Sequence, residues 1–453
     1  MRKILVLTFL STQMIFAQTI SQKLDKSVKE LLDSPYGVSS NLSLYVSDAQ
    51  GNLVYEYQGN KGLSTASTQK IFTAAAALEI LGKDFTYTTS VAYSGILNDG
   101  DLKGNLILTS NGDPTLGSWR YDGYKPENFK QKLITAIKQK GINKIEGNLV
   151  IDDSYFDFQT TPGGWPWNDM GNYYGAGVWG VNWRENQFDL KMNGNSIQST
   201  NITLPNVQWV SEVKAMGSSD QSLIFTAPHS DIALINGSLP AGKTMTVSGA
   251  TPNPPLTLGY EIKEWLKSNN IIFNGEILTA SAEQIKGKTI DQFPRENTFF
   301  EYKSPTLDKM VFWFLRKSIN LYGETFIKTL SAEKGKEGSF SEGVSILKSY
   351  WKSKGIPATM INFADGSGLS PQNYVSAKAE VQALNYAKKQ SWFNEYFDGF
   401  PTQSNGLKMK SGTMKDTKSF AGYHNNYTFS IIINNYQGGN SSEALFKILN
   451  NLK

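Results

Sequence analysis

The order of helical and strand periodicity along the chain is the feature that most restricts its fold. Residues 20–33 place apolar side chains on one helical face, and the alternating runs at 41–60 are typical of an antiparallel hairpin. Short alternating strands with Asn-Gly and Asp-Gly turns then extend from about residue 90 to about residue 290. Helical periodicity returns at 304–317, and strand-like runs and a helix end the chain. The sequence therefore predicts one α/β domain whose sheet is built from both chain ends, with a β-rich insertion between them.

The first 17 residues have the layout of a secretory signal peptide. Arg2 and Lys3 precede an apolar run at 4–10, and Ala17 ends the stretch with a small residue suited to cleavage. No later run approaches the roughly 18 apolar residues that a membrane span needs, so the mature chain is expected to be soluble. The closing helix at 441–453 is expected to pack on the sheet; the alternative, a membrane-surface anchor, is disfavoured by its weakly basic polar face.

The scarcity of certain residues excludes several kinds of chemistry. The chain has no cysteine and only two histidines, His229 and His424, and it lacks both H-E-x-x-H and G-x-S-x-G. Its formal net charge of +4 falls to about +2 without Arg2 and Lys3, and no basic block suggests a nucleic acid partner. Any hydrolytic reaction should therefore use a base other than histidine.

Ser67 and Lys70, in the segment STASTQKIFTAAAALEI, are the strongest candidates for a nucleophile and its base. Their spacing puts both side chains on one helix face, which is equally typical of any exposed helix. The same S-x-x-K spacing occurs in the chain at five serines: Ser67, Ser211, Ser331, Ser345 and Ser349. Ser67 differs from the others because it starts a helix, where free N–H groups favour negative charge on oxygen, and because the apolar run that follows indicates burial.

Two further short motifs follow in the order that this chemistry needs. Ser318-Ile319-Asn320 comes directly after the predicted helix at 304–317, and Lys410-Ser411-Gly412-Thr413 is the only K-[S/T]-G in the chain. Alone, the first is typical of a helix–helix turn and the second of a basic edge strand that runs into a turn. Together with Ser67 and Lys70, on helix, turn and strand, they predict an acyl-serine site.

A serine hydroxyl is a weak nucleophile until a neighbouring base takes its proton. Lysine, with a usual pKa of about 10.4, can be that base only when burial or a nearby positive charge lowers its pKa. Lys410 is the candidate for such a charge beside Lys70. A shift of roughly three units corresponds to about 4 kcal/mol, which a packed cleft can supply.

The remaining motif residues fit substrate binding. Asn320 can hold a substrate amide together with the lysine base, and Ser318 can pass a proton to a leaving amine. The strand residues at 410–411 suit an anionic terminal carboxylate. The backbone N–H groups of Ser67 and Thr413 can converge on an oxyanion, where the loss of one such donor costs about 2.7–4 kcal/mol.

This set of motifs resembles that of the D-alanyl-D-alanine carboxypeptidase/endopeptidases of the penicillin-binding protein 4 type, the class C low-molecular-mass group. The similarity covers nearly the whole mature chain, including the long separation of Lys70 from Ser318, where this family inserts two small β-rich domains. The similar segments are ASTQKIFTAAAALEILG, SPTLDKMVFWFLRKSINLYGE, ADGSGLSPQNYVSA and LKMKSGTMKDTKSFAGY, with SNGDPTL, GNLVIDDSYFD and PGGWPWNDMGNYYGAGVWGVNWREN in the insertion.

The resemblance implies an α/β (α+β) fold. A DD-peptidase/β-lactamase-like domain, with an antiparallel sheet flanked by helices, would be interrupted by two small β-rich inserted domains, II and III. The implied boundaries are 1–17 for the signal peptide, 18–90 and 293–453 for the DD-peptidase domain, 91–184 and 255–292 for domain II, and 185–254 for domain III.

The resemblance also implies the reaction. Ser67 would form an acyl-enzyme with the penultimate D-alanine carbonyl of a peptidoglycan stem peptide, with Lys70 as base and Ser318 as proton relay, and water would release the trimmed peptide. β-Lactams would acylate the same serine, and no metal or organic cofactor is implied. The location would be the periplasm, with the protein soluble or loosely membrane-associated. Residues that would bind the carboxylate and line the oxyanion hole are Lys410, Ser411, Gly412 and Thr413.

Several alternatives stay open. Removal of a terminal D-alanine and cleavage of a cross-link use the same residues, so the sequence does not separate carboxypeptidase from endopeptidase, and it does not indicate the oligomeric state. A serine β-lactamase or esterase would share the chemistry, but the long insertion and the lack of an evident deacylating glutamate argue against it. A non-catalytic peptidoglycan-binding scaffold would not need the motif residues. The chain has S-I-N where the usual motif is S-D-N, and K-S-G where it is K-T-G. Neither difference predicts a loss of activity, because Ile319 takes no part in the mechanism and Ser411 keeps the hydroxyl.

Three other features have a structural and a functional interpretation. Asp365–Gly368 is a Gly-rich turn and, by family analogy, a rim of the cleft. Asp113 is expected to be a turn residue. An aromatic cluster in the insertion is expected to be interdomain packing, with a glycan platform as the alternative; it comprises Trp165, Trp167, Tyr173, Tyr174, Trp179 and Trp183.

Overall fold

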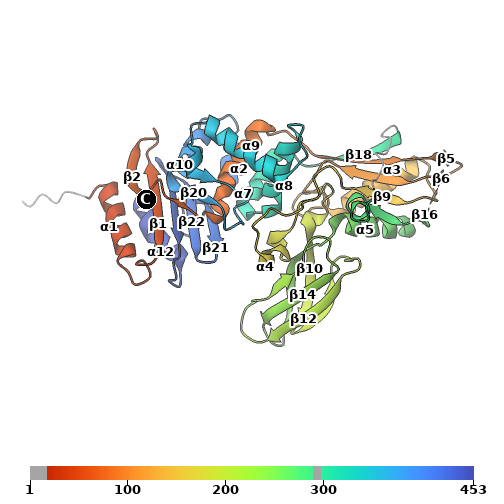
Figure 1. The fold of residues 1–453 in the computed structure, drawn as a ribbon, viewed down its shortest axis with the longest axis horizontal. Helices are drawn as coiled ribbons and strands as arrows, with labels where there is room; N and C mark the ends of the chain where they lie inside the picture. Colours follow the sequence, from red (N-terminus) through yellow and green to blue (C-terminus); the bar gives the residue numbers. More distant parts are fainter. Residues whose placement is uncertain (1–17, 289–296) are drawn as a thin grey trace, which may run out of the picture.

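The computed structural model describes residues 18–288 and 297–453, so the signal peptide predicted at 1–17 lies outside the described residues. Figure 1 shows that strands from the two ends of the chain, red and blue, lie side by side in one sheet, while the insertion extends away from it. The described residues thus divide into a sheet built from both termini, a layer of helices beside it, and the inserted region.

The sheet built from both ends is antiparallel throughout, as the hydrophobic pattern predicts. Its strand order is β2-β1-β23-β22-β21, so the strand that carries the K-S-G motif lies at an edge. The strands are β1 Asn41–Ser47, β2 Leu53–Tyr57, β21 Lys408–Met414, β22 Thr417–His424 and β23 Tyr427–Asn434.

One face of this sheet is covered by α1 (Ile20–Leu32) and α12 (Ser441–Leu449). Leu24 of α1 and Leu445 of α12 are fully buried in one apolar cluster with Leu44 of β1. The apolar stripe of the closing helix therefore packs on the sheet, as we expect from its sequence. Within the described residues, no helix is long and apolar enough to cross a membrane.

Six helices form the core on the other side of the sheet. The alanine-rich α2 is buried from Lys70 to Leu78, because a helix that is apolar on all sides can only lie inside a domain. Small alanine side chains let its neighbours approach closely. A short sheet, β19-β20-β3, closes this layer. The helices are α2 Lys70–Ile80, α7 Leu307–Lys317, α8 Asn320–Ala332, α9 Phe340–Ser353, α10 Ala377–Ala387 and α11 Phe393–Asp398, and the strands are β3 Gly62–Leu63, β19 Ile361–Asn362 and β20 Tyr374–Ser376.

The first part of the insertion contains two long helices that the sequence analysis does not predict, α3 (Pro126–Gln139) and α5 (Pro254–Ser268). They pack with two sheets, of order β17-β9-β7-β4-β18 and β16-β8-β6-β5, in which several pairs are parallel. The short helix α6 (Ala280–Ile285) follows β17. The strands are β4 Thr88–Tyr93, β5 Ile96–Asn98, β6 Asp101–Lys103, β7 Leu106–Ser110, β8 Lys144–Ile145, β9 Leu149–Asp152, β16 Ile272–Phe273, β17 Ile277–Thr279 and β18 Thr298–Lys303.

The second part of the insertion has two three-stranded sheets with one apolar core between them. Their orders are β11-β10-β15 and β12-β14-β13. The strands are β10 Gln187–Asn193, β11 Ser196–Thr200, β12 Gln208–Ala215, β13 Leu223–Phe225, β14 Ile232–Leu239 and β15 Thr244–Ala250. The single-turn helix α4 (Trp167–Met170) lies against β13, between this unit and the helical layer (Figure 1).

Candidate active site

Ser67 lies in a 3-10 turn, Ala66–Gln69, that leads directly into α2. Its side chain is partly exposed, while both neighbouring side chains are buried. Ala66 has a positive φ of 48°, a conformation that L-residues rarely adopt and that costs of order 1–3 kcal/mol. The turn is strained, and it presents a single hydroxyl at the buried N-terminal end of a helix.

Lys70 is fully buried beneath this hydroxyl. Its Nζ lies 2.9 Å from Ser67 Oγ, and it also donates to Asn320 Oδ1 (2.6 Å) and to the Ser367 carbonyl (2.7 Å). Burial lowers the Lys70 pKa to about 7, against the opposing effect of the negative charges of Asp365 and Glu324. A lysine with this pKa is about half neutral at pH 7, so a substantial fraction of it can accept a proton.

The S-I-N motif occupies the turn between α7 and α8. Ser318 ends α7 in the left-handed conformation, with φ of 59°, and Asn320 begins α8. This tight reversal brings both side chains to the same cavity. Asn320 uses both ends of its amide: Oδ1 accepts from Lys70 Nζ, and Nδ2 donates to the Tyr174 carbonyl of the insertion (2.8 Å).

The K-S-G motif lies on edge strand β21, against the Ser67 turn. Lys410 is buried and donates to Ser318 Oγ (3.0 Å) and to the Ser411 carbonyl (2.7 Å). A Cβ at Gly412 would lie 2.2 Å from the Thr65 carbonyl oxygen and 3.0 Å from Ser67 N. Only glycine lets the strand lie this close to the nucleophile.

The electrostatics differ in one respect from the sequence expectation. The pKa of Lys410 lies well below its usual value, first because of burial and then because of the positive charges of Lys70 and Lys418. Lys70, by contrast, owes its lowered pKa to burial, so no second positive charge is needed to explain it. Of the two causes that the sequence analysis names for a lowered lysine pKa, burial acts on Lys70, and the repulsion between the two lysines lowers the pKa of Lys410.

The sequence-predicted residues surround one cavity of about 720 Å³. Lys70 and Lys410 lie buried behind its wall, and Ser411 and Gly412 form the strand backbone instead of the lining. Thr413 is exposed at the rim, where its Oγ1 accepts from Lys418 Nζ (2.7 Å). The lining includes Ser67, Ser318, Asn320 and Thr413 from the predicted set, with Pro166, Asn168, Asp169, Tyr173, Tyr174 and Gln187 from the insertion.

Two buried carboxyl groups lie near Lys70; the sequence places Asp365 only in a Gly-rich turn at the cleft rim and does not predict Glu324. Asp365 begins the Gly-rich turn, and its carboxylate accepts hydrogen bonds from five donors. Glu324 accepts from Gly366 N (3.0 Å), and burial raises its pKa to about 8. Glu324 follows Asn320 by one helical turn, a spacing that places both on one face of α8, but many glutamates show such a spacing by chance.

The other candidate residues have structural positions. Asp113 is buried in a turn, and its carboxylate accepts from Thr115 N (2.8 Å) and Thr115 Oγ1 (2.6 Å), as expected. In the aromatic cluster, Trp165, Trp179 and Trp183 are buried, which agrees with packing. Trp167 and Tyr173 are exposed by 61% and 56%, so packing does not account for them.

Comparison with known proteins shows the family of this chain. The model of the D-Ala-D-Ala carboxypeptidase 3 (S13) family matches residues 24–452, nearly the whole chain. The chain belongs to this family. It is thus a serine DD-peptidase of the carboxypeptidase type that acts on peptidoglycan.

Curated relatives of this S13 peptidase share about a quarter of its residues. It is 26% identical over 423 residues to the D-alanyl-D-alanine carboxypeptidase DacB of Haemophilus influenzae, covering 86% of this chain and 84% of the relative. It is 25% identical over 456 residues to a D-alanyl-D-alanine carboxypeptidase of an Actinomadura species, covering 92% and 82%. The crystal structure of penicillin binding protein 4 from H. influenzae matches with a TM-score of 0.77 at 24% identity, over 95% of this chain and 98% of the other, and supports the fold.

Proposed function

We propose that Ser67 is the nucleophile of this S13 peptidase and that Lys70 is its general base. The observation that supports this most directly is the 2.9 Å separation of Lys70 Nζ and Ser67 Oγ, with a lysine pKa of about 7. The neutral amine takes the hydroxyl proton as Ser67 Oγ attacks the carbonyl carbon of the penultimate D-alanine. The bond to the terminal residue then breaks, and the serine carries the acyl group.

The proton must reach the leaving amine for the bond to break. Ser318 lies beside Lys410, which donates to its hydroxyl at 3.0 Å, so this serine can relay a proton across the cavity. Asn320 holds the lysine amine on one side and is fixed by the Tyr174 carbonyl on the other. A water molecule then attacks the acyl-enzyme, with Lys70 again as base, and releases the trimmed peptide.

The proposed binding sites for the oxyanion and for the substrate carboxylate are formed by β21 and the Ser67 turn. Because β21 is an edge strand, it has backbone groups that β22 does not use, and its Thr413 N–H together with that of Ser67 is proposed to form the oxyanion hole. The terminal carboxylate of the substrate is proposed to bind at Ser411, Gly412 and Thr413, near the buried amine of Lys410 and the partly buried amine of Lys418.

The finer assignments follow from the same site. β-Lactams are cyclic amides that can acylate Ser67, and a structure of the H. influenzae penicillin binding protein 4 is described as complexed with a β-lactam. Export by the signal peptide at 1–17 and location in the periplasm would place the enzyme beside peptidoglycan. Terminal D-alanine removal and cross-link cleavage use the same residues, so both are candidate reactions. The insertion residues that border the cavity would decide between them by limiting the bulk of the substrate.

The test is covalent labelling of the mature protein with a fluorescent penicillin, followed by peptide mass spectrometry. We expect one adduct per chain on Ser67 and none in the Ser67→Ala variant. No adduct on the folded protein would favour the non-catalytic scaffold, and an adduct on another serine would contradict the assignment. Rapid loss of the adduct with repeated turnover would favour the β-lactamase alternative. Digestion of defined muropeptides then distinguishes carboxypeptidase from endopeptidase activity.

A further inference from the structure

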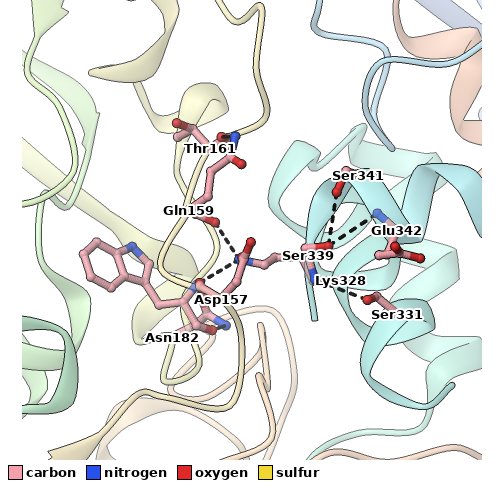
Figure 2. Close-up of polar contacts among 10 residues, drawn as sticks. Asp157, Gln159, Thr161, Asn182, Lys328, Ser331, Ser339, Ser341 and Glu342 are labelled. Atoms are coloured by element: carbon pink, nitrogen blue, oxygen red, sulfur yellow. Dashed lines mark hydrogen bonds and ion pairs between the residues drawn. The ribbon is translucent and has the colours of Figure 1, made fainter. Parts of the chain in front are cut away.

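One stretch of the insertion, residues 157–174, contacts helix α8 at both of its ends and the turn that begins at Asp365 near its middle. We call this stretch the strap. Its first end is held by Lys328 of α8, whose side chain is fully buried and not used in the proposed mechanism. Figure 2 shows Lys328 reaching from α8 to Asp157 and Gln159. Its Nζ lies 2.7 Å from the Asp157 carboxylate and donates to the Gln159 carbonyl at 2.6 Å.

The middle of the strap contacts the turn that supports the catalytic lysine. Trp165 Nε1 donates to Asp365 Oδ2 (2.9 Å), and the indole is buried. The same carboxylate accepts from the Gly368 amide (2.7 Å) and the Ser370 amide (2.6 Å), which fixes the turn. Ser367 lies in this turn between Asp365 and Gly368, and its carbonyl accepts from Lys70 Nζ (2.7 Å). Trp165 is therefore two hydrogen bonds and one short turn away from the proposed base.

The last residue of the strap sets the orientation of a side-chain amide. The Tyr174 carbonyl can only accept, so it binds the Nδ2 end of Asn320 and leaves Oδ1 facing Lys70 Nζ. If the strap moved away, the amide could rotate and present its N–H group to the lysine. That orientation would lose one hydrogen bond and oppose a protonated amine.

We infer that Trp165 and Lys328 are positioning residues for the peptidase reaction. They hold the strap so that its Tyr174 carbonyl and its contact with Asp365 keep Lys70 in place against Ser67. The insertion is then part of the catalytic apparatus and does more than border the substrate cavity. The inference rests on the proposed roles of Lys70 and Asn320 and extends them to residues that do not touch the substrate.

The primary test compares Trp165→Phe with Trp183→Phe. Both indoles are buried and donate to one carboxylate, Trp183 Nε1 to Glu261 at 3.1 Å, but Trp183 lies in the core of the first inserted unit. We would measure the second-order rate of Ser67 labelling by a fluorescent penicillin as a function of pH, together with the thermal unfolding midpoint of each variant.

We expect Trp165→Phe to slow acylation by about tenfold to a hundredfold, the usual effect of small misplacements in an active site. The acid limb of its pH–rate profile, in which the rate falls as the pH is lowered, should move to higher pH. Water that enters beside Lys70 reduces the burial that lowers the lysine pKa. The titratable groups around Lys70 are the carboxyl groups of Asp365 and Glu324, whose ionised forms raise its pKa, and Lys410 behind Ser318. Trp183→Phe should change the unfolding midpoint but neither the rate nor the acid limb.

The other end of the strap is tested with the double variant Lys328→Met/Asp157→Asn. It removes both charges together, so that neither charge is left without its partner, and it also removes the donor to the Gln159 carbonyl. We expect its acylation rate to fall by a similar factor. Its thermal unfolding midpoint should change by no more than that of Trp183→Phe. If both strap variants acylate like Trp183→Phe at every pH, the inference is wrong. If the wild-type protein itself gains no adduct on Ser67, the proposed function is wrong instead, so the two failures are distinguishable.

Discussion

At the scale of single residues, the reactivity of this S13 peptidase depends on the burial of Lys70. The amine has three hydrogen-bond partners around it, Ser67, Asn320 and the Ser367 carbonyl, and no bulk solvent. Desolvation disfavours the charged form of a lysine, so the site obtains a neutral base without a histidine. The nearby carboxyl groups of Asp365 and Glu324 raise the Lys70 pKa and so limit how far burial lowers it.

The first prediction concerns the pH dependence of acylation. Because Lys70 must be neutral to accept the Ser67 proton and its pKa is about 7, the rate should fall about tenfold per pH unit below that value and level off above it. The measurement is the rate of penicillin labelling at a series of pH values. An acid limb near the ordinary lysine pKa of about 10.4 would contradict the lowered pKa of Lys70, and the absence of any acid limb would contradict its role as the base.

The second prediction concerns the pH dependence of stability. Glu324 has a folded-state pKa of about 8, raised from 4.5, so it is protonated in the folded protein while the unfolded chain ionises. Its contribution to stability therefore declines as pH rises from about 4.5 to about 8. Glu324→Gln removes this titration, so the variant should gain thermal stability relative to wild type across that window. The exposed control Glu301→Gln should show no such trend, and a parallel course of Glu324→Gln and wild type would contradict the argument.

The sequence predicts the motif residues but not the groups that support them. Ser67, Lys70 and the two downstream motifs have fixed local spacings, which can be read along the chain. Asp365 and the Tyr174 carbonyl act on Lys70 only after the fold brings together segments more than a hundred residues apart. A backbone carbonyl has no sequence signature at all, so this part of the site required the structure.

At the scale of elements, the site depends on how closely edge strand β21 lies against the turn that carries Ser67. The Ser419 hydroxyl of β22 bonds the Thr65 carbonyl and lies 3.0 Å from Thr68 Oγ1, so two strands hold the turn. Gly412 is the point of closest approach. Because both oxyanion donors are proposed to come from these two elements, their separation should control catalysis more than stability.

The third prediction is therefore that Gly412→Ala slows acylation by about a hundredfold. The added Cβ would lie 2.2 Å from the Thr65 carbonyl oxygen and 2.3 Å from Ser419 Oγ, so β21 must move away from the turn. The labelling rate and the unfolding midpoint are measured together. Gly439→Ala is the control, because a Cβ there meets no atom within 4 Å. A Gly412→Ala protein with wild-type labelling would show that the strand position is not critical.

Elements were predicted well where one hydrophobic period was sustained and poorly where periods were mixed. The hairpin of β1 and β2, helix α7 and the closing helix follow the sequence closely. Helix α3 was missed although Phe129, Leu133 and Ile137 lie on one face, because it is surrounded by Gly-rich turns and short strands. The parallel pairing of β7 with β9 joins strands separated by a helix, and strand periodicity does not specify such partners.

At the scale of the whole molecule, the insertion and the peptidase helices are joined by buried polar contacts as well as apolar packing. One such contact is the ion pair of Lys328 and Asp157. In another, the carboxylate of Glu185 in the insertion accepts from Tyr322 OH of α8 (2.7 Å), and also from Ser118 Oγ (2.6 Å) and Arg120 Nε (2.9 Å). A buried carboxylate that loses a donor is left partly unsatisfied, which is costly. The two regions should therefore unfold together.

The last prediction tests this coupling with Tyr322→Phe, which keeps the buried ring and removes the hydroxyl that donates to Glu185 and accepts from Tyr121 OH. We expect the free energy of unfolding to fall by roughly 1.5–3 kcal/mol, the usual contribution of a hydrogen bond to a charged group. Denaturant unfolding followed by tryptophan fluorescence measures the change, and wild type should show one transition. Tyr374→Phe, whose ring is half exposed, is the control and should change stability by less than about 0.5 kcal/mol. If Tyr322→Phe behaves like this control, apolar packing alone joins the two regions, and the strap would then be anchored by Lys328 and Trp165 without help from Glu185.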